Sequence, residues 1–257
     1  KAANDQPNLV KKETFRYDLV DVVRQALADA AFYQLQQVRS AFDSGDLAAY
    51  RKQVKRFLSL ISDMDALLAT DSQFLLGTWQ KRALDWGDSR QEKALMDKSA
   101  KMLITTWIDQ VPRSLNDYSN RQWAGLVSDF YLPRWKNFFE FQMDVLIGKK
   151  TRDAAHAAFM DKMVRNELAF AGNGKIYSAK PAGDTLAVAN RVMNTHREML
   201  DALGAEEKHS SGSPWELQQG SPLQFDVTDQ VTASGTYTAT FQWKNGPSAL
   251  KIHSVRL

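Results

Sequence analysis

The sequence predicts a mainly α-helical protein, a bundle-like domain of several helices followed by a small antiparallel β segment. Over roughly the first 200 of its 257 residues, apolar side chains recur at steps of three and four, the period of an α-helix. Residues 205–222 are then polar and contain Ser, Gly and Pro, which is typical of a linker. Beyond them the apolar period becomes two, as in a β-strand. We therefore divide the chain into a helical domain at 1–204, a linker at 205–222 and a small β module at 223–257.

Two long helices are expected to open the helical domain. After a polar arm at 1–13, one apolar face runs from Leu19 to Phe42. Gly45 is expected to end that helix, and Asp46 can cap the next one. The second helix is predicted by the apolar positions Val54, Phe57, Leu58, Ile61, Met64, Leu67 and Leu68.

Shorter helices are expected to follow. Asp71 and Ser72 offer an N-cap for a helix that runs to about Leu84. Gly87 breaks the pattern, and a further helix is predicted from Gln91 to about Trp107.

The most informative stretch is 107–135, because it mixes aromatic rings with polar side chains. Aromatic faces bind the apolar faces of sugars, while amides, carboxylates and guanidinium groups bind hydroxyls. Pro112 predicts that this stretch begins as a loop. A helix is expected from Tyr118 to about Tyr131, and Pro133 must then kink or restart it. The aromatic residues of this stretch are Trp107, Tyr118, Trp123, Phe130, Tyr131 and Trp135.

Two further helices are expected to complete the domain. The first runs from Thr151 to about Phe170, and Asp184 caps the second, which ends at Gly204. In the β module, Asn245-Gly246 is a strong hairpin-turn dipeptide between alternating apolar residues.

Composition excludes several classes of function. A hydrophobic content of 44% and a charged content of 25% are those of an ordinary globular protein, and the dispersed net charge of +3 does not predict nucleic-acid binding. The absence of cysteine excludes disulfides and thiolate catalysis. No metal site is expected from the scattered histidines, and His196 is interpreted as a core or boundary residue. The four are His156, His196, His209 and His253.

Three blocks of sequence resemble the C-terminal helical domain of the α-N-acetylglucosaminidases, glycoside hydrolase family 89. They occur in the order and at about the spacing found there, and they cover about the first 200 residues. The blocks begin at Phe15-Arg16-Tyr17-Asp18, at Asp71-Ser72-Gln73-Phe74, and at Asp117-Tyr118-Ser119-Asn120, the last continuing to Pro133-Arg134-Trp135. The segment 223–257 is similar to short β modules at the ends of bacterial glycoside hydrolases.

The resemblance implies a domain of an exo-acting, retaining enzyme that needs no cofactor or metal. In that family both catalytic glutamates lie in a preceding (β/α)₈ barrel, and no eightfold alternation of strand and helix occurs here. We therefore expect no catalytic residue in this chain and no hydrolysis by it alone. Its expected partners are an upstream barrel of the same polypeptide and a glycan with terminal α-N-acetylglucosamine, without nucleic acid or a membrane span. A secreted or periplasmic bacterial location is also expected.

Substrate-binding residues follow from the same resemblance. It implies that Trp107 is an apolar floor or lid and Tyr118 a stacking and hydrogen-bonding wall, while Leu115 contacts the acetamido methyl. From the residues alone these positions flank a polar loop, and loops on rigid scaffolds often carry function. The other aromatic residues of this region are interpreted as core because they recur at helical spacing: Trp123, Phe130, Trp135, Phe138 and Phe139.

Structural and interface roles are expected for five residues. Arg134 is expected to hold a carboxylate or free carbonyls inside the domain rather than to bind substrate, with Trp135 beside it. Arg16, Tyr17 and Asp18 form either a contact between domains or an ordinary first helical turn. The alternative function for the whole chain is a free-standing helical module that binds carbohydrate or protein.

Overall fold

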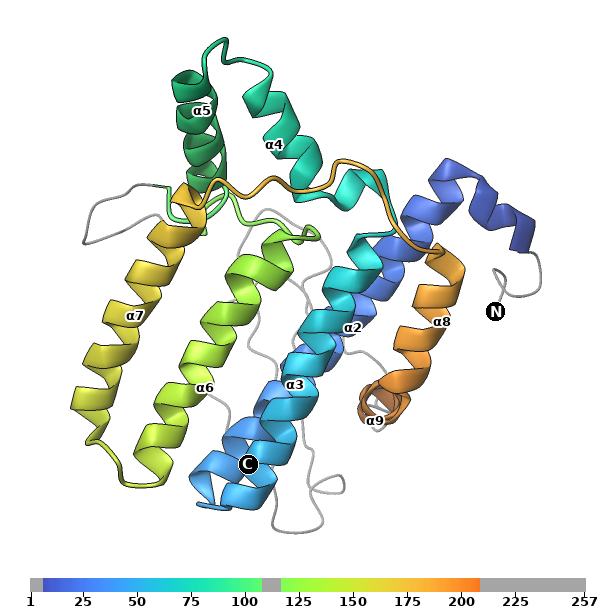
Figure 1. Cartoon of the computed structure of the whole chain (residues 1–257). Helices are drawn as coiled ribbons and strands as arrows, with labels where there is room; N and C mark the ends of the chain where they lie inside the picture. Colours follow the sequence, from blue (N-terminus) through green and yellow to red (C-terminus); the bar gives the residue numbers. More distant parts are fainter. Residues whose placement is uncertain (1–6, 108–116, 209–257) are drawn as a thin grey trace, which may run out of the picture. The chain divides into compact units, whose positions relative to one another are not determined.

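The computed structural model describes residues 7–107 and 117–208 (Figure 1). These residues form helices joined by short loops, which confirms the mainly helical prediction for this part of the chain. Within it, strand-like pairing is limited to an isolated bridge between Leu75 and Ala124. The predicted β module at 223–257, and the predicted linker beyond Lys208, lie outside the described residues.

A long antiparallel hairpin of two helices forms the body of the domain. A short 3-10 helix, Pro7–Lys11, leads into α2 at Glu13–Asp43, and α3 follows at Leu47–Leu68. The turn between them is the predicted one. Gly45 adopts a φ of +71°, which favours glycine, and the Asp46 carboxylate accepts a hydrogen bond from the Ala49 amide.

A second hairpin, of α4 and α5, projects at one end of the domain (Figure 1). Asp71 does act as a cap, but of the short 3-10 helix Ser72–Phe74, and α4 then runs over Leu76–Leu84. A capping box between Ser89 and Glu92 begins α5 at Arg90–Leu103. This helix ends four residues before Trp107, because the chain turns at 104–106 to bring Trp107 to the surface of the domain.

The prediction of a helix from Tyr118 is wrong over its first turns. Residues 117–119 form a turn, and Ala124 is held in extended conformation by backbone hydrogen bonds to Phe74 and Leu76. Gly125 follows with a φ of +88°. Backbone pairing with a distant segment therefore overrides the local helical pattern.

A π-helical turn at Val127–Tyr131 then leads directly into α6 at Leu132–Leu146. The Asp65 carboxylate of α3 accepts hydrogen bonds from the Gly125 and Ser128 amides at the start of this turn. Pro133 is the second residue of α6. The backbone is helical on both sides of it, so the predicted kink or restart takes the form of a change from π-helical to α-helical geometry.

The remaining helices are α7 at Arg152–Gly172, α8 at Thr185–Thr195 and α9 at Arg197–Lys208. Asp184 caps α8 as predicted, and Thr151, which was predicted to begin its helix, is the N-cap of α7. The single final helix of the prediction is divided at His196. In addition, α9 continues past Gly204, because strong helix formers follow it.

Three of the helices form a layer, and a fourth helix packs behind it. In Figure 1, α7, α6 and α3 lie side by side, α2 lies behind α3, and α8 and α9 pack against α2 and α3. An extended segment at 173–184 connects α7 to α8 across the base of the α4–α5 hairpin. The main core fills the space between these helices, and a smaller apolar cluster joins the hairpin to the layer through Leu76, Ile104, Leu126, Phe130 and Phe170.

Candidate functional site

Two aromatic rings, those of Trp107 and Tyr118, lie close together between the end of α5 and the π-helical turn. The ring centroids of Trp107 and Tyr118 are 5.2 Å apart in an edge-to-face arrangement with an interplanar angle of 66°. Tyr118 is 70% exposed and Trp107 is half-buried. The structure therefore brings together two of the three predicted sugar-contacting residues, while Leu115 lies outside the described residues.

Strained backbone supports both rings. Trp107 and Asp117 have φ values of 63° and 59°, a left-handed conformation that residues with a β-carbon rarely adopt. The Trp107 amide donates to the Met102 carbonyl at 2.8 Å, and the Asp117 amide donates to the Thr105 carbonyl at 2.8 Å. Such conformations persist only where surrounding contacts enforce them, and they cluster at functional sites.

Tyr118 occupies the tip of a tight turn. The Asn120 amide donates to the Asp117 carbonyl at 3.1 Å, which closes a four-residue turn with Tyr118 as its second residue. The phenol is thus presented to solvent by the turn rather than by a helix, which explains its high exposure.

Arg134 joins this turn to the helical layer. Its guanidinium binds both Asp117 oxygens, at 2.5 and 3.2 Å, and its Nε donates to the Glu167 carboxylate of α7 at 2.8 Å. The guanidinium also lies 4.5 Å from the centroid of the Phe130 ring. Arg134 therefore contacts two carboxylates of its own domain, which supports the structural role expected for it.

The electrostatics of this cluster favour its charged state. Burial alone would lower the pKa of Arg134, but the hydrogen bonds and charges of Asp117 and Glu167 outweigh burial, and the net pKa is raised. Burial raises the pKa of the neighbouring Tyr131 to about 12, with a smaller contribution from the Asp117 charge. Neither Arg134 nor Tyr131 is therefore suited to exchange protons near neutral pH.

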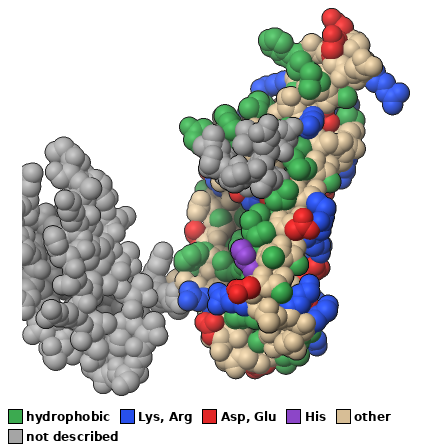
Figure 2. Space-filling view, turned by 90° about the vertical axis from the view of Figure 1, so that its left-hand side faces the viewer, with side chains coloured by type: hydrophobic (Ala, Val, Ile, Leu, Met, Phe, Trp, Pro, Cys, Tyr) green, Lys and Arg blue, Asp and Glu red, His purple; other side chains and the backbone are tan. Residues whose placement is uncertain are grey.

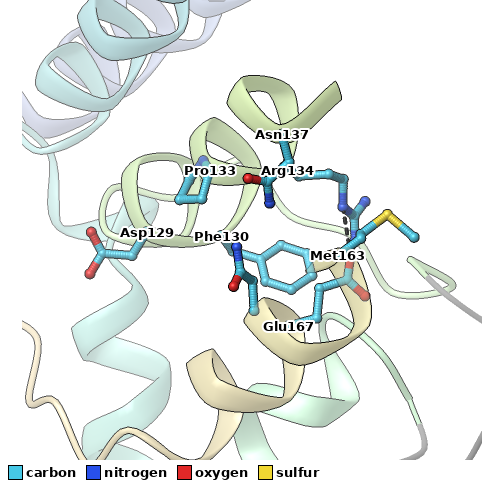
Figure 3. A pocket seen from close by; sticks show the side chains of 8 residues that line it. Asp129, Phe130, Pro133, Arg134, Asn137, Met163 and Glu167 are labelled. Carbon is cyan, nitrogen blue, oxygen red and sulfur yellow. Dashed lines mark hydrogen bonds and ion pairs between the residues drawn. The ribbon is translucent and has the colours of Figure 1, made fainter. Parts of the chain in front are cut away.

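A hollow between α6 and α7 lies beside Arg134 (Figure 3). Its volume is about 220 Å³, and this figure includes the open solvent at its mouth, so the enclosed part is smaller. Asn137 points into it beside the Arg134–Glu167 pair, and its side-chain nitrogen is buried without a hydrogen-bond partner among the described residues. The hollow can hold water but is too small to be a sugar site by itself.

The first predicted block forms contacts within the domain. Arg16 donates to the Asp71 carboxylate at 2.9 Å, and Asp71 is fully buried. The ring of Tyr17 stacks on Phe74 at 5.1 Å between centroids, while the Asp18 side chain is exposed. Arg16 and Tyr17 thus tie the start of α2 to the segment before α4, and a contact with another domain remains a prediction for Asp18 and for the 40% of Tyr17 that is exposed.

The core interpretation of the other aromatic residues is confirmed. Phe130 and Phe139 are each 3% exposed. Trp135 packs against Phe57 and Phe139, at 4.7 and 5.7 Å between ring centroids. Trp123 and Phe138 are partly buried against the same core.

A buried lysine was not anticipated from the sequence. Lys101 is fully buried, donates to Asp97 at 2.8 Å and to the Asn173 side chain at 3.0 Å, and lies 5.6 Å from the Tyr177 ring centroid. This cluster anchors the last turn of α5, and Trp107 follows the end of this helix by four residues. The four-residue spacing of Asp97 and Lys101 could have predicted the ion pair but not its burial.

His196 is buried, as predicted, and lies between α8 and α9. Its Nε2 is 2.8 Å from Asp63 Oδ2, while its Nδ1 has no hydrogen-bond partner in the described part of the chain. Within residues 7–107 and 117–208, no three His, Asp or Glu side chains converge as metal ligands would. No helix in these ranges is long and apolar enough to cross a membrane.

The outer face on the α7 side carries mixed charge. Figure 2 shows acidic and basic side chains interspersed with hydrophobic ones on this face, with acidic groups beside the basic ones. Ion pairs around α6 and α7 include Lys162 with Glu140 and Lys149 with Asp144. This face therefore offers no extended basic surface.

Comparison with known proteins identifies relatives of this helical domain. Residues 1–195 match the family described as the alpha-N-acetylglucosaminidase (NAGLU) C-terminal domain. Alpha-N-acetylglucosaminidase of Homo sapiens is 32% identical over 187 residues, which are 72% of this chain and 25% of that protein. The chain thus spans about a quarter of the length of this curated relative.

Solved structures with a similar fold include a family 89 glycoside hydrolase from Clostridium perfringens. Its complex with PUGNAc has a TM-score of 0.67 and 25% sequence identity, covering 76% of this chain and 22% of that one. Its complex with its substrate, GlcNAc-alpha-1,4-galactose, has a TM-score of 0.66 and 25% identity, covering 77% of this chain and 23% of that one.

Proposed function

Because this chain belongs to the family of the α-N-acetylglucosaminidase C-terminal domain, we propose that it forms one wall of the substrate cleft of an exo-acting, retaining α-N-acetylglucosaminidase. The enzyme would release terminal α-linked N-acetylglucosamine from glycans. Its catalytic glutamates would lie in a (β/α)₈ barrel earlier in the same polypeptide, and its retaining chemistry would need no cofactor. A secreted or periplasmic location in a bacterium is part of this proposal.

The observation that carries the proposal is the exposed Trp107–Tyr118 pair on strained, tightly braced backbone. An edge-to-face pair offers one ring face for the apolar side of a sugar and a phenol for a hydroxyl or acetamido group. The hollow beside Arg134 lies between α6 and α7 and is not lined by this pair, so a second wall is needed. A domain that spans a quarter of its relative is consistent with a barrel that supplies this wall.

The test compares variants in the polypeptide that includes the barrel. We expect Trp107→Ala to lower kcat/KM for an aryl α-N-acetylglucosaminide by about tenfold or more, because a stacking surface is lost. Phe32→Ala is the matched control, since it removes a ring that is 67% exposed on α2. Equal kinetics for the wild type and both variants would contradict the cleft-wall function.

The isolated chain provides the complementary test. We expect it to show no hydrolysis of the aryl substrate and no calorimetric binding of N-acetylglucosamine at millimolar concentration, because only one wall is present. Hydrolysis by the isolated chain would contradict the expectation that it contains no catalytic residue. Binding that Trp107→Ala abolishes would instead favour the free-standing carbohydrate-binding module.

A further inference from the structure

Asp117 uses every polar group that it has to hold one conformation. Its amide donates to Thr105, its carbonyl accepts from Asn120, and its carboxylate binds the Arg134 guanidinium through both oxygens. Its φ of 59° is disfavoured for a residue with a β-carbon. The residue that precedes Tyr118 is therefore held by all of its polar groups in a left-handed conformation, which Asp adopts more readily than most residues with a β-carbon.

Arg134 is itself fixed from the other side. Glu167 of α7 is 2% exposed. It accepts a hydrogen bond from Arg134 Nε at 2.8 Å, and the closest ion-pair distance between the two side chains is 2.6 Å. The Phe130 ring lies beneath the guanidinium, and Figure 3 shows Arg134 and Glu167 facing one another between α6 and α7. A guanidinium with two carboxylate partners and a ring beneath it has little freedom to rotate.

These contacts form a continuous connection from the buried face of α7 to the surface turn. The Glu167 carboxylate binds the Arg134 guanidinium, and this guanidinium binds the Asp117 carboxylate. The backbone conformation of Asp117 then determines where the chain places Tyr118. Resting on the proposed function, we infer that Arg134 and Asp117 are positioning residues that hold the Tyr118 phenol and the Trp107 ring at the geometry the sugar requires. Neither positioning residue touches the sugar in this proposal.

Two substitutions separate this role from general stability. Asn adopts the left-handed conformation at least as readily as Asp, so Asp117→Asn removes the ionic contact and keeps the backbone preference. Arg134→Lys keeps the positive charge but loses the planar fork that binds two carboxylates. Arg165→Gln is the control, because it removes an exposed arginine on α7 that pairs with Asp161.

The first readout is amide hydrogen exchange in this chain, followed by NMR. We expect the amides of positions 117 and 120 to exchange at least about tenfold faster in Asp117→Asn and Arg134→Lys, with amides of α3 unchanged. Arg165→Gln should leave the exchange of positions 117 and 120 unaltered. Unchanged exchange in both variants would overturn the inference without any reference to sugar.

The second readout is kinetics in the polypeptide that includes the barrel. We expect Asp117→Asn to raise KM for an aryl α-N-acetylglucosaminide by about tenfold, in the same direction as Trp107→Ala. If Trp107→Ala impairs the enzyme and Asp117→Asn does not, the positioning role is wrong and the cleft-wall function stands. If both variants match the wild type, the cleft-wall function fails, and the positioning role fails with it.

Discussion

Single carboxylates in this domain depend on a few hydrogen bonds to offset the cost of partial burial. Asp129, on the π-helical turn, accepts hydrogen bonds from the Tyr177 hydroxyl at 2.8 Å and from the Lys175 ammonium at 2.5 Å. Burial alone would raise the pKa of Asp129, but these two contacts outweigh it and the net pKa is lowered. The contacts of Asp129 with the extended segment at 173–184 are therefore strongest while Asp129 is ionised.

The sign of the resulting pH dependence follows from the lowered pKa. A carboxyl with a lower pKa in the folded state stabilises the fold fully above its unfolded value of about 3.9, and this contribution is lost as pH falls through the folded value. We expect Asp129→Asn to reduce the free energy of unfolding by about 1 kcal/mol at pH 7, since Lys175 is largely exposed and solvent screens the pair. The difference between variant and wild type should shrink as pH falls below about 4, as measured by urea denaturation.

A matched control is available on α7. Asp161 pairs with Arg165 four residues away, and both side chains are about two-thirds exposed. Asp161→Asn should change the free energy of unfolding by only a few tenths of a kcal/mol. A constant effect of Asp129→Asn across the whole pH range would show that its contribution is not ionic.

At the level of helices and segments, the extended segment at 173–184 passes so close to α4 that position 77 has room only for glycine. A β-carbon at Gly77, on the first turn of α4, would lie 2.2 Å from the Ser178 carbonyl oxygen. The Gln80 side chain binds the same segment, donating to the Lys175 carbonyl at 2.7 Å and accepting from the Tyr177 amide at 2.8 Å. The glycine of the second sequence block is thus required by the crossing of two backbones.

Gly77→Ala should therefore destabilise the domain. The methyl group would meet a carbonyl of the main chain, which cannot move aside as a flexible side chain can, so we expect a loss of about 1–3 kcal/mol. Gly172→Ala is the control, because a β-carbon there meets nothing within 4 Å and Ala favours helix over Gly. Thermal and urea unfolding of both variants measure the effect, and equal stabilities would contradict the crossing.

At the scale of the whole molecule, the helical domain contains its own core. The buried apolar residues of the described chain lie between Val20 and Met199, and this compact unit ends at Ser210. We therefore expect a chain that ends at Ser210 to unfold in one cooperative transition, with a melting temperature within a few degrees of that of the full 257 residues. Calorimetry of the two chains makes the comparison. Loss of the cooperative transition on truncation would show that 211–257 contributes to this core.

The sequence alone predicted that this domain is helical and where several of its helices begin or end. Gly45, Asp46 and Asp184 act where predicted, because a cap or a glycine turn depends on residues within about four positions. The apolar faces of α2 and α3 were predicted for the same reason, since helical periodicity is local. It also predicted which aromatic residues are core and that Trp107 and Tyr118 differ from them.

The contacts that support the candidate site depend on the tertiary structure and could not be predicted from the sequence. Asp117, Arg134 and Glu167 are separated by tens of residues, and they meet because α6, α7 and the surface turn are packed against one another. Ala124 was predicted to be helical, but it pairs with Leu75 in an isolated β-bridge, because the two distant segments are packed against each other. A sequence pattern carries the preference of each residue for its near neighbours, whereas contacts between distant segments are selected by the burial and hydrogen bonding of the whole fold.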